Sequence, residues 1–222
     1  MTVLAATYFK NNAEMIEACA KLKFIDKRMS ILDPTFGNGL WWTKWKPARL
    51  YYHDFALDGV DFRNLPYPDN RFDAIAFDPP YVSAGGREST TIKKMYDAYG
   101  MKGAPTSPLL LQRLINRGLR ENYRVVRPAK MDKEELLRGG IVLVKCMDYV
   151  SSGQLWSGTY WTERYARRLG FRIEDKLIHV KKSGGPQPKG RTRKLKTGEV
   201  VPSRQQHAAH NASMLLVLRK VA

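Results

Sequence analysis

The apolar positions of the chain follow two patterns, short uninterrupted runs and longer stretches at helical spacing. Short runs bounded by turn-forming residues are typical of strands that are buried on both faces. Apolar side chains that recur three and four positions apart predict amphipathic helices. Strands are expected near residues 31–32, 50–54, 72–77, 140–146, 177–180 and 214–218, and helices over 11–24, 109–127 and 158–169. This alternation predicts an α/β fold, with a parallel-centred sheet flanked by helices and two closing antiparallel strands.

Residues 72–81 join a buried strand to a stiff polar turn. The apolar run ends at Asp78, and the two prolines that follow it fix φ and lack backbone N–H groups. Neither a strand nor a helix can therefore continue through them. The turn holds a carboxylate, two carbonyls and the ring of Tyr81 at the carboxyl end of a strand. In open α/β sheets, this is the end at which ligands bind.

The tetrapeptide Asp78-Pro79-Pro80-Tyr81 resembles the catalytic signature of S-adenosylmethionine (SAM)-dependent methyltransferases that act on exocyclic amino groups of nucleic-acid bases. The resemblance implies that Asp78 and the carbonyl of Pro79 accept hydrogen bonds from the amine and draw its lone pair out of the ring plane. It also implies that Tyr81 stacks on a base turned out of the helix. All four residues, Pro80 included, are the expected catalytic residues. The alternative is an ordinary β-turn whose aspartate caps a loop.

A second motif follows the first predicted strand. The segment Asp33-Pro34-Thr35-Phe36-Gly37-Asn38-Gly39 resembles the SAM-binding loop of the same family, which passes under the methionine part of the cofactor. Its glycines permit close approach of the backbone to a ligand. The segment lacks the third glycine and the spacing of a dinucleotide fingerprint, which argues against NAD. The two motifs together favour SAM as the cofactor.

Two further acids match the family in position. Asp54 ends the second predicted strand, where an acid commonly accepts hydrogen bonds from ribose hydroxyls. Asp61 lies where the family's next acid contacts the adenine amino group. Only six residues separate the two, although a parallel strand pair needs about a dozen linking residues. A third strand must therefore be rudimentary or its connection irregular.

The full set of expected cofactor contacts includes Tyr8, because in related methyltransferases the segment before the first strand often lies over the cofactor. The set is Tyr8, Asp33, Pro34, Thr35, Phe36, Gly37, Gly39, Asp54, Asp61, Phe62 and Asp78.

The charge of the chain favours a polyanionic partner. Lys and Arg number 38 against 21 Asp and Glu, giving a net charge of +17, and nucleic acid is the usual partner of such a protein. The polar loop 82–108 is expected to close over the target strand, with disordered surface as the alternative. The basic loop 181–212 is not expected to fold on its own and suits a phosphate backbone, with a solubilising loop as the alternative. The expected nucleic-acid contacts are Lys93, Lys94, Lys181, Lys182, Lys189, Arg191, Arg193, Lys194, Lys196 and Arg204.

The helix over 109–127 carries arginines at three- and four-residue steps, which predicts one cationic stripe. A solvated outer face is the preferred interpretation, and contact with phosphate is the alternative. The stripe consists of Arg113, Arg117, Arg120, Arg124 and Arg127.

The two cysteines and the hydropathy of the sequence indicate the cellular compartment of the protein. Cys19 and Cys146 lie in apolar segments without metal-binding spacing, so they are interpreted as reduced core residues of a cytosolic protein. No metal site is expected. The sequence has no signal peptide and no apolar run near about 18 residues, so neither export nor a membrane span is indicated. The expected location is the cytoplasm of a bacterial or phage-infected cell.

The sequence thus predicts a single domain, residues 1–222, with the Rossmann-like methyltransferase fold that the resemblance implies, including a reversed last strand. The main hypothesis is an adenine-N6 DNA methyltransferase that flips its target base and transfers the methyl group directly. Aspartate at the first place of the tetrapeptide favours adenine in this family, although cytosine-N4 stays open. An RNA guanine-N2 or adenine-N6 methyltransferase is the second hypothesis. The third is a nucleic-acid-binding protein with an inactive methyltransferase fold.

Overall fold

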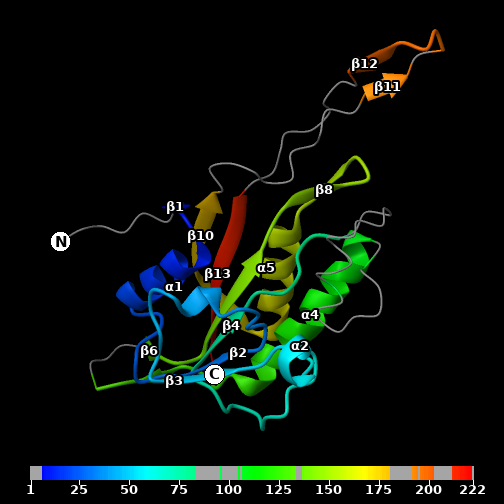
Figure 1. Cartoon of the computed structure of the whole chain (residues 1–222). Coiled ribbons are helices and arrows are strands. Elements are labelled where there is room, and N and C mark those ends of the chain that lie inside the picture. Colours follow the sequence, from blue (N-terminus) through cyan, green and yellow to red (C-terminus); the bar gives the residue numbers. More distant parts are fainter. Residues whose placement is uncertain are drawn as a thin grey trace.

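A seven-stranded sheet forms the centre of the computed structural model, which describes residues 7–83, 96, 105, 107–133, 137–180, 192–194, 196–202 and 212–221 (Figure 1). The strand order is β1-β10-β13-β7-β4-β2-β3. Only β13 runs antiparallel to its neighbours, β10 and β7. The strands are β1 (Thr7–Phe9), β2 (Ser30–Asp33), β3 (Arg49–Tyr52), β4 (Ala74–Phe77), β7 (Ile141–Cys146), β10 (Phe171–Val180) and β13 (Ala212–Lys220). The predicted α/β fold, with a mostly parallel sheet and a reversed last strand, is confirmed.

Helices cover both faces of the sheet (Figure 1). Helix α1 (Asn12–Lys21) and the short 3₁₀ helix η1 (Leu40–Trp42) pack on one face with Ala74, Ala76 and Leu143. Helices α4 (Pro108–Val125) and α5 (Gly158–Leu169) pack on the other face, which includes Phe77 and Val144. The three predicted helices are therefore confirmed, with slightly different ends. Among the helices that the structure describes, none combines the length and apolarity needed to cross a bilayer.

In the residues that the structure describes, three small hairpins lie outside the main sheet. They are β5 (Lys130–Met131) with β6 (Leu137–Arg138), β8 (Tyr149–Ser151) with β9 (Gln154–Trp156), and β11 (Thr192–Lys194) with β12 (Val200–Pro202). The third corrects an expectation, because the basic loop 181–212 was not expected to fold on its own. Cross-strand backbone pairing from residue 192 to residue 202 forms this hairpin despite the high charge. Residues 181–191, 195 and 203–211 lie outside the described residues.

The two edges of the sheet bear on the expected cofactor site. Among the described residues, no strand pairs with the outer side of β3, and the connection from β3 to β4 contains the short helix α2 (Phe55–Asp58). The prediction that the third strand is rudimentary or its connection irregular is thus confirmed. Strand β1 pairs with β10 at the opposite edge. Three strands separate it from β4, a span of roughly 19 Å. The contact of Tyr8 with the cofactor stays a prediction.

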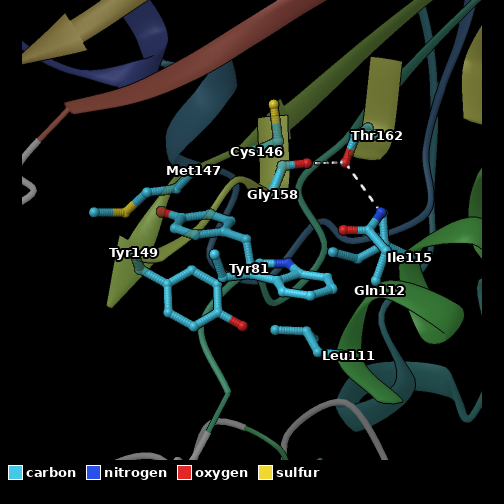
Figure 2. A pocket seen from close by; sticks show the side chains of 10 residues that line it. Tyr81, Leu111, Gln112, Ile115, Cys146, Met147, Tyr149, Gly158 and Thr162 are labelled. Carbon is cyan, nitrogen blue, oxygen red and sulfur yellow. Dashed lines mark hydrogen bonds between the residues drawn. The ribbon is translucent and has the colours of Figure 1, made fainter. Parts of the chain in front are cut away.

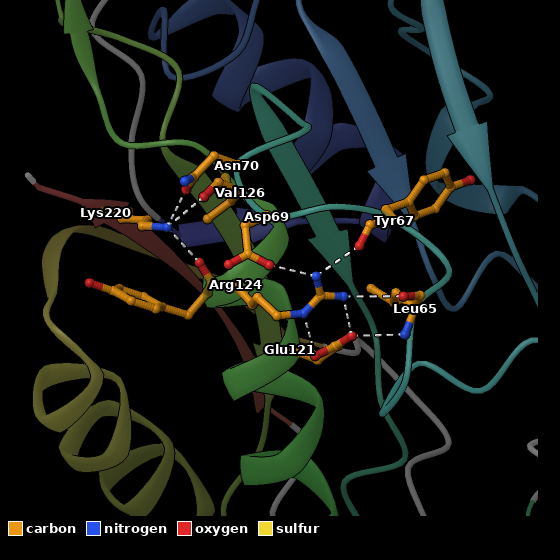
Figure 3. A network of polar contacts seen from close by, with 9 residues as sticks. Leu65, Tyr67, Asp69, Asn70, Glu121, Arg124, Val126 and Lys220 are labelled. Atoms are coloured by element: carbon orange, nitrogen blue, oxygen red, sulfur yellow. Dashed lines mark hydrogen bonds and ion pairs between the residues drawn. The ribbon is translucent and has the colours of Figure 1, made fainter.

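One arginine ties the carboxyl end of α4 to the segment 65–70 (Figure 3). The Arg124 guanidinium donates to the carbonyls of Leu65 and Tyr67 at 3.1 and 2.7 Å, and to the carboxylates of Asp69 and Glu121 at 2.8 and 2.6 Å. The hydrogen bond to Glu121 raises the pKa of Arg124 above its ordinary value, and the bond to Asp69 adds to the shift. This arginine is a structural clamp.

The predicted arginine stripe is therefore interrupted. Arg124 is held in this clamp, and Arg127 forms an ion pair with the buried carboxylate of Asp73. Both guanidinium groups form contacts with other parts of the protein. The spacing of arginines along a helix does not predict such contacts. The arginines of the stripe that stay exposed are Arg113, Arg117 and Arg120.

Candidate active site

The two predicted motifs meet at the carboxyl edge of the sheet. Strands β2 and β4 are parallel neighbours, with Leu32 opposite Ile75, so the loops that leave their ends lie side by side. The backbone N–H of Asp78 donates a hydrogen bond to the side-chain hydroxyl of Thr35 at 2.8 Å. The Asp-Pro-Pro-Tyr turn and the glycine loop are thus joined directly.

Two consecutive tryptophans of η1 hold the two strand-end carboxylates. The Trp42 indole N–H donates to Asp33 at 2.7 Å, and the Trp41 indole N–H donates to Asp78 at 3.1 Å. Both rings are buried in the core on the α1 side. The hydrogen bonds to the motif carboxylates were not anticipated. They fix the two acids relative to each other through one short helix.

Asp33 stabilises the glycine loop from within. Its carboxylate is buried and also accepts hydrogen bonds from the backbone N–H and the hydroxyl of Thr35, at 3.0 and 3.4 Å. Burial raises the pKa of Asp33 to about 7, although the bonds from Trp42 and Thr35 oppose the shift. This side chain therefore shapes the loop rather than presenting its oxygens to a ligand.

Asp78 titrates close to neutral pH. Burial raises the pKa of its carboxyl to about 6, and the positive charge of Lys145 and the hydrogen bond from Trp41 limit the rise. Lys145 lies in β7 and is itself buried, where it donates a hydrogen bond to the side chain of Asn12 at the start of α1. Lys145 is not among the site residues predicted from the sequence. The available signal was a lysine inside the apolar run 141–146, where a charge is costly unless it is paired.

The glycine loop presents open backbone beside these acids. Gly37 and Gly39 both have positive φ, at 54° and 68°, a region that glycine adopts at no steric cost. A Cβ added at Gly37 would meet no protein atom within 4 Å. Phe36 stacks on Tyr52 at the end of β3, with 4.2 Å between the ring centroids. The loop therefore has a rigid base and an accessible backbone at its tip.

Asp54, the expected ribose ligand, supports the same loop. One carboxylate oxygen accepts from the N–H of Gly37 and the other from the N–H of Ala56 at the start of α2, both at 2.9 Å. The carboxylate thus ties the glycine loop to the end of β3. Each oxygen accepts one hydrogen bond in these contacts and has capacity for another.

Asp61 and Phe62 both contact other protein side chains. Arg63 donates to both oxygens of Asp61 at 2.6 to 2.9 Å. Partial burial works to raise the pKa of Asp61, but these hydrogen bonds outweigh it and hold the pKa below its usual range. Phe62 is buried against Phe77 in the core on the α4 side, with 5.3 Å between ring centroids. Its ring is part of the core, and its contact with the cofactor stays a prediction.

Tyr81 packs against the core on the α4 side, whereas Trp41 belongs to the core on the α1 side. Tyr81 borders a narrow crevice under α4 and α5 (Figure 2). Burial raises the pKa of its hydroxyl well above the ordinary range, so the ring stays neutral. The spaces between the lining side chains are narrower than a water molecule. A ligand can therefore enter only if lining side chains move. The crevice is lined by Tyr81, Leu111, Gln112, Ile115, Cys146, Met147, Tyr149, Trp156, Gly158 and Thr162.

Polar contacts give the crevice a fixed wall. Gln112 of α4 donates to the hydroxyl of Thr162 at 3.3 Å, and that hydroxyl donates to the carbonyl of Gly158 at 2.8 Å (Figure 2). The first of these bonds crosses from α4 to α5. Tyr96, from the loop predicted as polar, is fully buried beside this region and donates to the carbonyl of Val82 at 3.1 Å. Part of the expected target loop therefore belongs to the core.

Most expected nucleic-acid contacts lie outside the described residues. Arg193 and Lys194 fall in β11, and Lys196 is exposed in the turn that follows it. The others are Lys93, Lys94, Lys181, Lys182, Lys189, Arg191 and Arg204.

No family model and no curated protein matches the chain, whereas solved structures resemble it. A candidate methyltransferase from Bacillus halodurans is 12% identical, with 94% of this chain and 100% of that chain covered and a TM-score of 0.49. A candidate DNA modification methylase from Thermus thermophilus, solved with S-adenosyl-L-methionine, is 14% identical over 87% and 56%, with a TM-score of 0.44. TrmN from the same organism is 14% identical over 94% and 49%, with a TM-score of 0.46. This chain spans about half the length of the last two. The likeness is one of fold.

Proposed function

We propose that this chain is a SAM-dependent methyltransferase that modifies the exocyclic N6 amine of adenine in DNA, by base flipping and direct transfer. One observation carries the proposal. The hydrogen bond from the N–H of Asp78 to the hydroxyl of Thr35 joins the glycine loop to the Asp-Pro-Pro-Tyr turn. A loop open to a cofactor and a turn suited to an amine therefore share one edge of two adjacent strands.

The residues at this edge fit SAM. Open space beside Gly37 lets the backbone of residues 34–39 approach the methionine part of the cofactor. Asp54, at the end of β3, retains acceptor capacity for ribose hydroxyls. When bound, SAM supplies an electrophilic methyl group carried on a sulfonium. The chain has to hold that group beside Asp78 and keep water away from it.

The turn supplies what a weakly nucleophilic amine needs. The Asp78 carboxylate and the Pro79 carbonyl can both accept hydrogen bonds from the amine, which draws its lone pair out of the ring plane. The two prolines hold these acceptors in place without backbone donors that would compete for them. Tyr81 offers a neutral aromatic face for stacking on the extruded base. Because the crevice beside it has no water-sized space, base entry has to displace lining side chains.

The net charge of +17 supports nucleic acid as the substrate. The basic loop 181–212 would lie along the phosphate backbone, and β11–β12 would present part of it. DNA is proposed over RNA because the tetrapeptide resembles that of DNA amino-methyltransferases.

The decisive experiment identifies the methylated nucleoside. The full chain is incubated with SAM and either unmethylated duplex DNA or ribosomal and transfer RNA, and the products are digested to nucleosides and identified by mass. The expected product is N6-methyl-2′-deoxyadenosine from the sample that contains DNA. N4-methylcytosine or a methylated RNA nucleoside would instead assign the runner-up substrates. If no nucleoside gains a methyl group and calorimetry finds no SAM binding, the chain is a nucleic-acid-binding protein with an inactive fold.

Alanine substitutions at the two glycines should separate cofactor binding from loop stability. Both positions have positive φ, so each alanine costs about 1 kcal/mol of backbone strain. At Gly39 the new Cβ would also lie 2.7 Å from the ring of Phe36, so the loop must shift. We expect G37A to reduce SAM affinity roughly tenfold or more with little further loss of stability, because its Cβ fills the space left for the cofactor. G39A should lose both affinity and thermal stability.

Calorimetry with SAM and thermal unfolding of the two variants provide the measurement. A G37A variant that binds SAM as tightly as the unsubstituted protein would remove the glycine loop from the cofactor site.

A further inference from the structure

The outward face of α5 carries three exposed arginines, Arg164, Arg167 and Arg168. Two large aromatic residues accompany them on the same helix, Tyr160 with 54% of its surface exposed and Trp161 with 37%. Together, these five residues form what we call the α5 surface. A shallow hollow of about 420 Å³ lies against this helix. The hollow is lined by Tyr160, Glu163, Arg164, Arg167 and Arg168.

The charge of the α5 surface is not neutralised locally. Glu163 is the acid in the hollow, and its carboxylate pairs with Lys176 of β10 at 2.6 Å. Within the described part of the chain, no carboxylate forms an ion pair with any of the three arginines. The guanidinium of Arg164 lies over the ring of Trp161, 5.5 Å from its centroid, and donates to the hydroxyl of Tyr160 at 3.4 Å. Cationic and aromatic groups are therefore interleaved, as in surfaces that bind nucleic acid.

The α5 surface is continuous with the crevice beside Tyr81. Trp156, the last residue of β9, lines the crevice and stacks on Trp161 with 6.0 Å between ring centroids. Thr162 faces the crevice from the inner side of α5. One helix thus contributes a crevice wall on its inner side and a cationic surface on its outer side. From Trp161 to Arg168 the surface extends roughly 10 Å along the helix axis.

We propose that the duplex DNA flanking the target base lies along the α5 surface, with the three arginines at its phosphates and Trp161 at the entrance to the crevice. The identity of the target base rests on the proposed function, but the docking of DNA on this surface does not. The surplus of positive charge on the α5 surface selects a polyanion over the mixed charges of an ordinary protein surface. Phosphate contacts of this kind orient a duplex without reading its sequence.

The test measures DNA binding by the full chain without SAM. A labelled short duplex is titrated across a series of salt concentrations with the variant R164Q/R167Q/R168Q and with the matched control R113Q/R117Q/R120Q. The control removes the same charge from the exposed face of α4. We expect the α5 variant to bind DNA about 10- to 100-fold more weakly, and its slope of log affinity against log salt to fall by roughly 2 to 3, at about 0.9 per phosphate contact. The α4 control should change the affinity by less than about threefold.

Equal losses in the two variants would show a general effect of net charge and would overturn the proposal. An unchanged salt slope in the α5 variant, or an unsubstituted protein that does not bind duplex DNA, would overturn it as well. The titration is repeated with a labelled RNA duplex. If the α5 substitutions weaken the binding of RNA but not of DNA, the surface binds RNA and DNA is rejected as its occupant. The assay involves neither SAM nor turnover. A protein that fails to methylate DNA can therefore still show the expected loss of DNA affinity in the α5 variant. The two proposals can therefore fail separately.

Discussion

Replacing Asp78 by alanine is expected to slow single-turnover methyl transfer by about 1,000-fold or more, while SAM affinity changes by less than about threefold. The rate falls because the amine loses the charged acceptor of the turn. The affinity persists because the glycine loop is anchored by the backbone N–H of Asp78 to Thr35, a contact that alanine retains. Rapid-quench measurement of methylated DNA and calorimetry with SAM report the two quantities. Unchanged activity in D78A would remove Asp78 from the mechanism.

Asparagine at the same position distinguishes hydrogen bonding from charge. D78N keeps an acceptor oxygen for the amine and for the Trp41 indole N–H, but it cannot ionise. We expect a loss of only about 10- to 100-fold. The unsubstituted rate should rise with pH through about 6, because burial raises the pKa of Asp78 to that value and the ionised carboxylate is the better acceptor. D78N should lack this rise. A rise that persists in D78N would belong to another group.

The parts of the site that the sequence predicted are local in the chain. Each motif consists of a buried strand and the turn that follows it, and both signals lie within about ten consecutive residues. Once the strands are known to be parallel, their carboxyl ends must share one edge of the sheet. The meeting of Thr35 and Asp78 follows from this rule. The reversed last strand of the sheet was predicted from the family resemblance and from the apolar runs near the end of the chain.

The parts that were missed depend on partners far away in the sequence. Lys145 reads as one residue of an apolar strand, and its hydrogen-bond partner Asn12 lies 133 positions earlier. Arg124 fits the helical spacing of a surface stripe, but its acceptors Leu65, Tyr67 and Asp69 come from a loop more than 50 positions away. The periodicity of apolar and polar residues predicts which face of a helix or strand a residue occupies. It does not predict which segment of the chain packs against that face.

Replacing Lys145 by methionine is expected to shift the pH dependence of methyl transfer upward by on the order of one pH unit. Lys145 and Asp78 lie at the ends of the adjacent parallel strands β7 and β4, and alternation places both on the α1 side with Leu143 and Ala76. Burial favours the protonated form of Asp78, whereas the ammonium of Lys145 favours the ionised form. Without the ammonium, the pKa of Asp78 should rise further above 6. The rate should then fall most at pH 6 to 7 and recover as the pH increases.

A matched control distinguishes this electrostatic role from loss of stability. Lys220 is a partly buried lysine at the other end of the strands, where it donates to the carbonyls of Tyr123 and Val126 and to the side chain of Asn70 (Figure 3). K220M should lower thermal stability and leave the pH midpoint of the rate unchanged. Rate profiles of both variants, recorded from pH 5 to 9 well below their unfolding temperatures, provide the measurement. If K145M lowers the rate by the same factor at every pH, Lys145 supports the fold alone and the charge of Asp78 is set by its other neighbours.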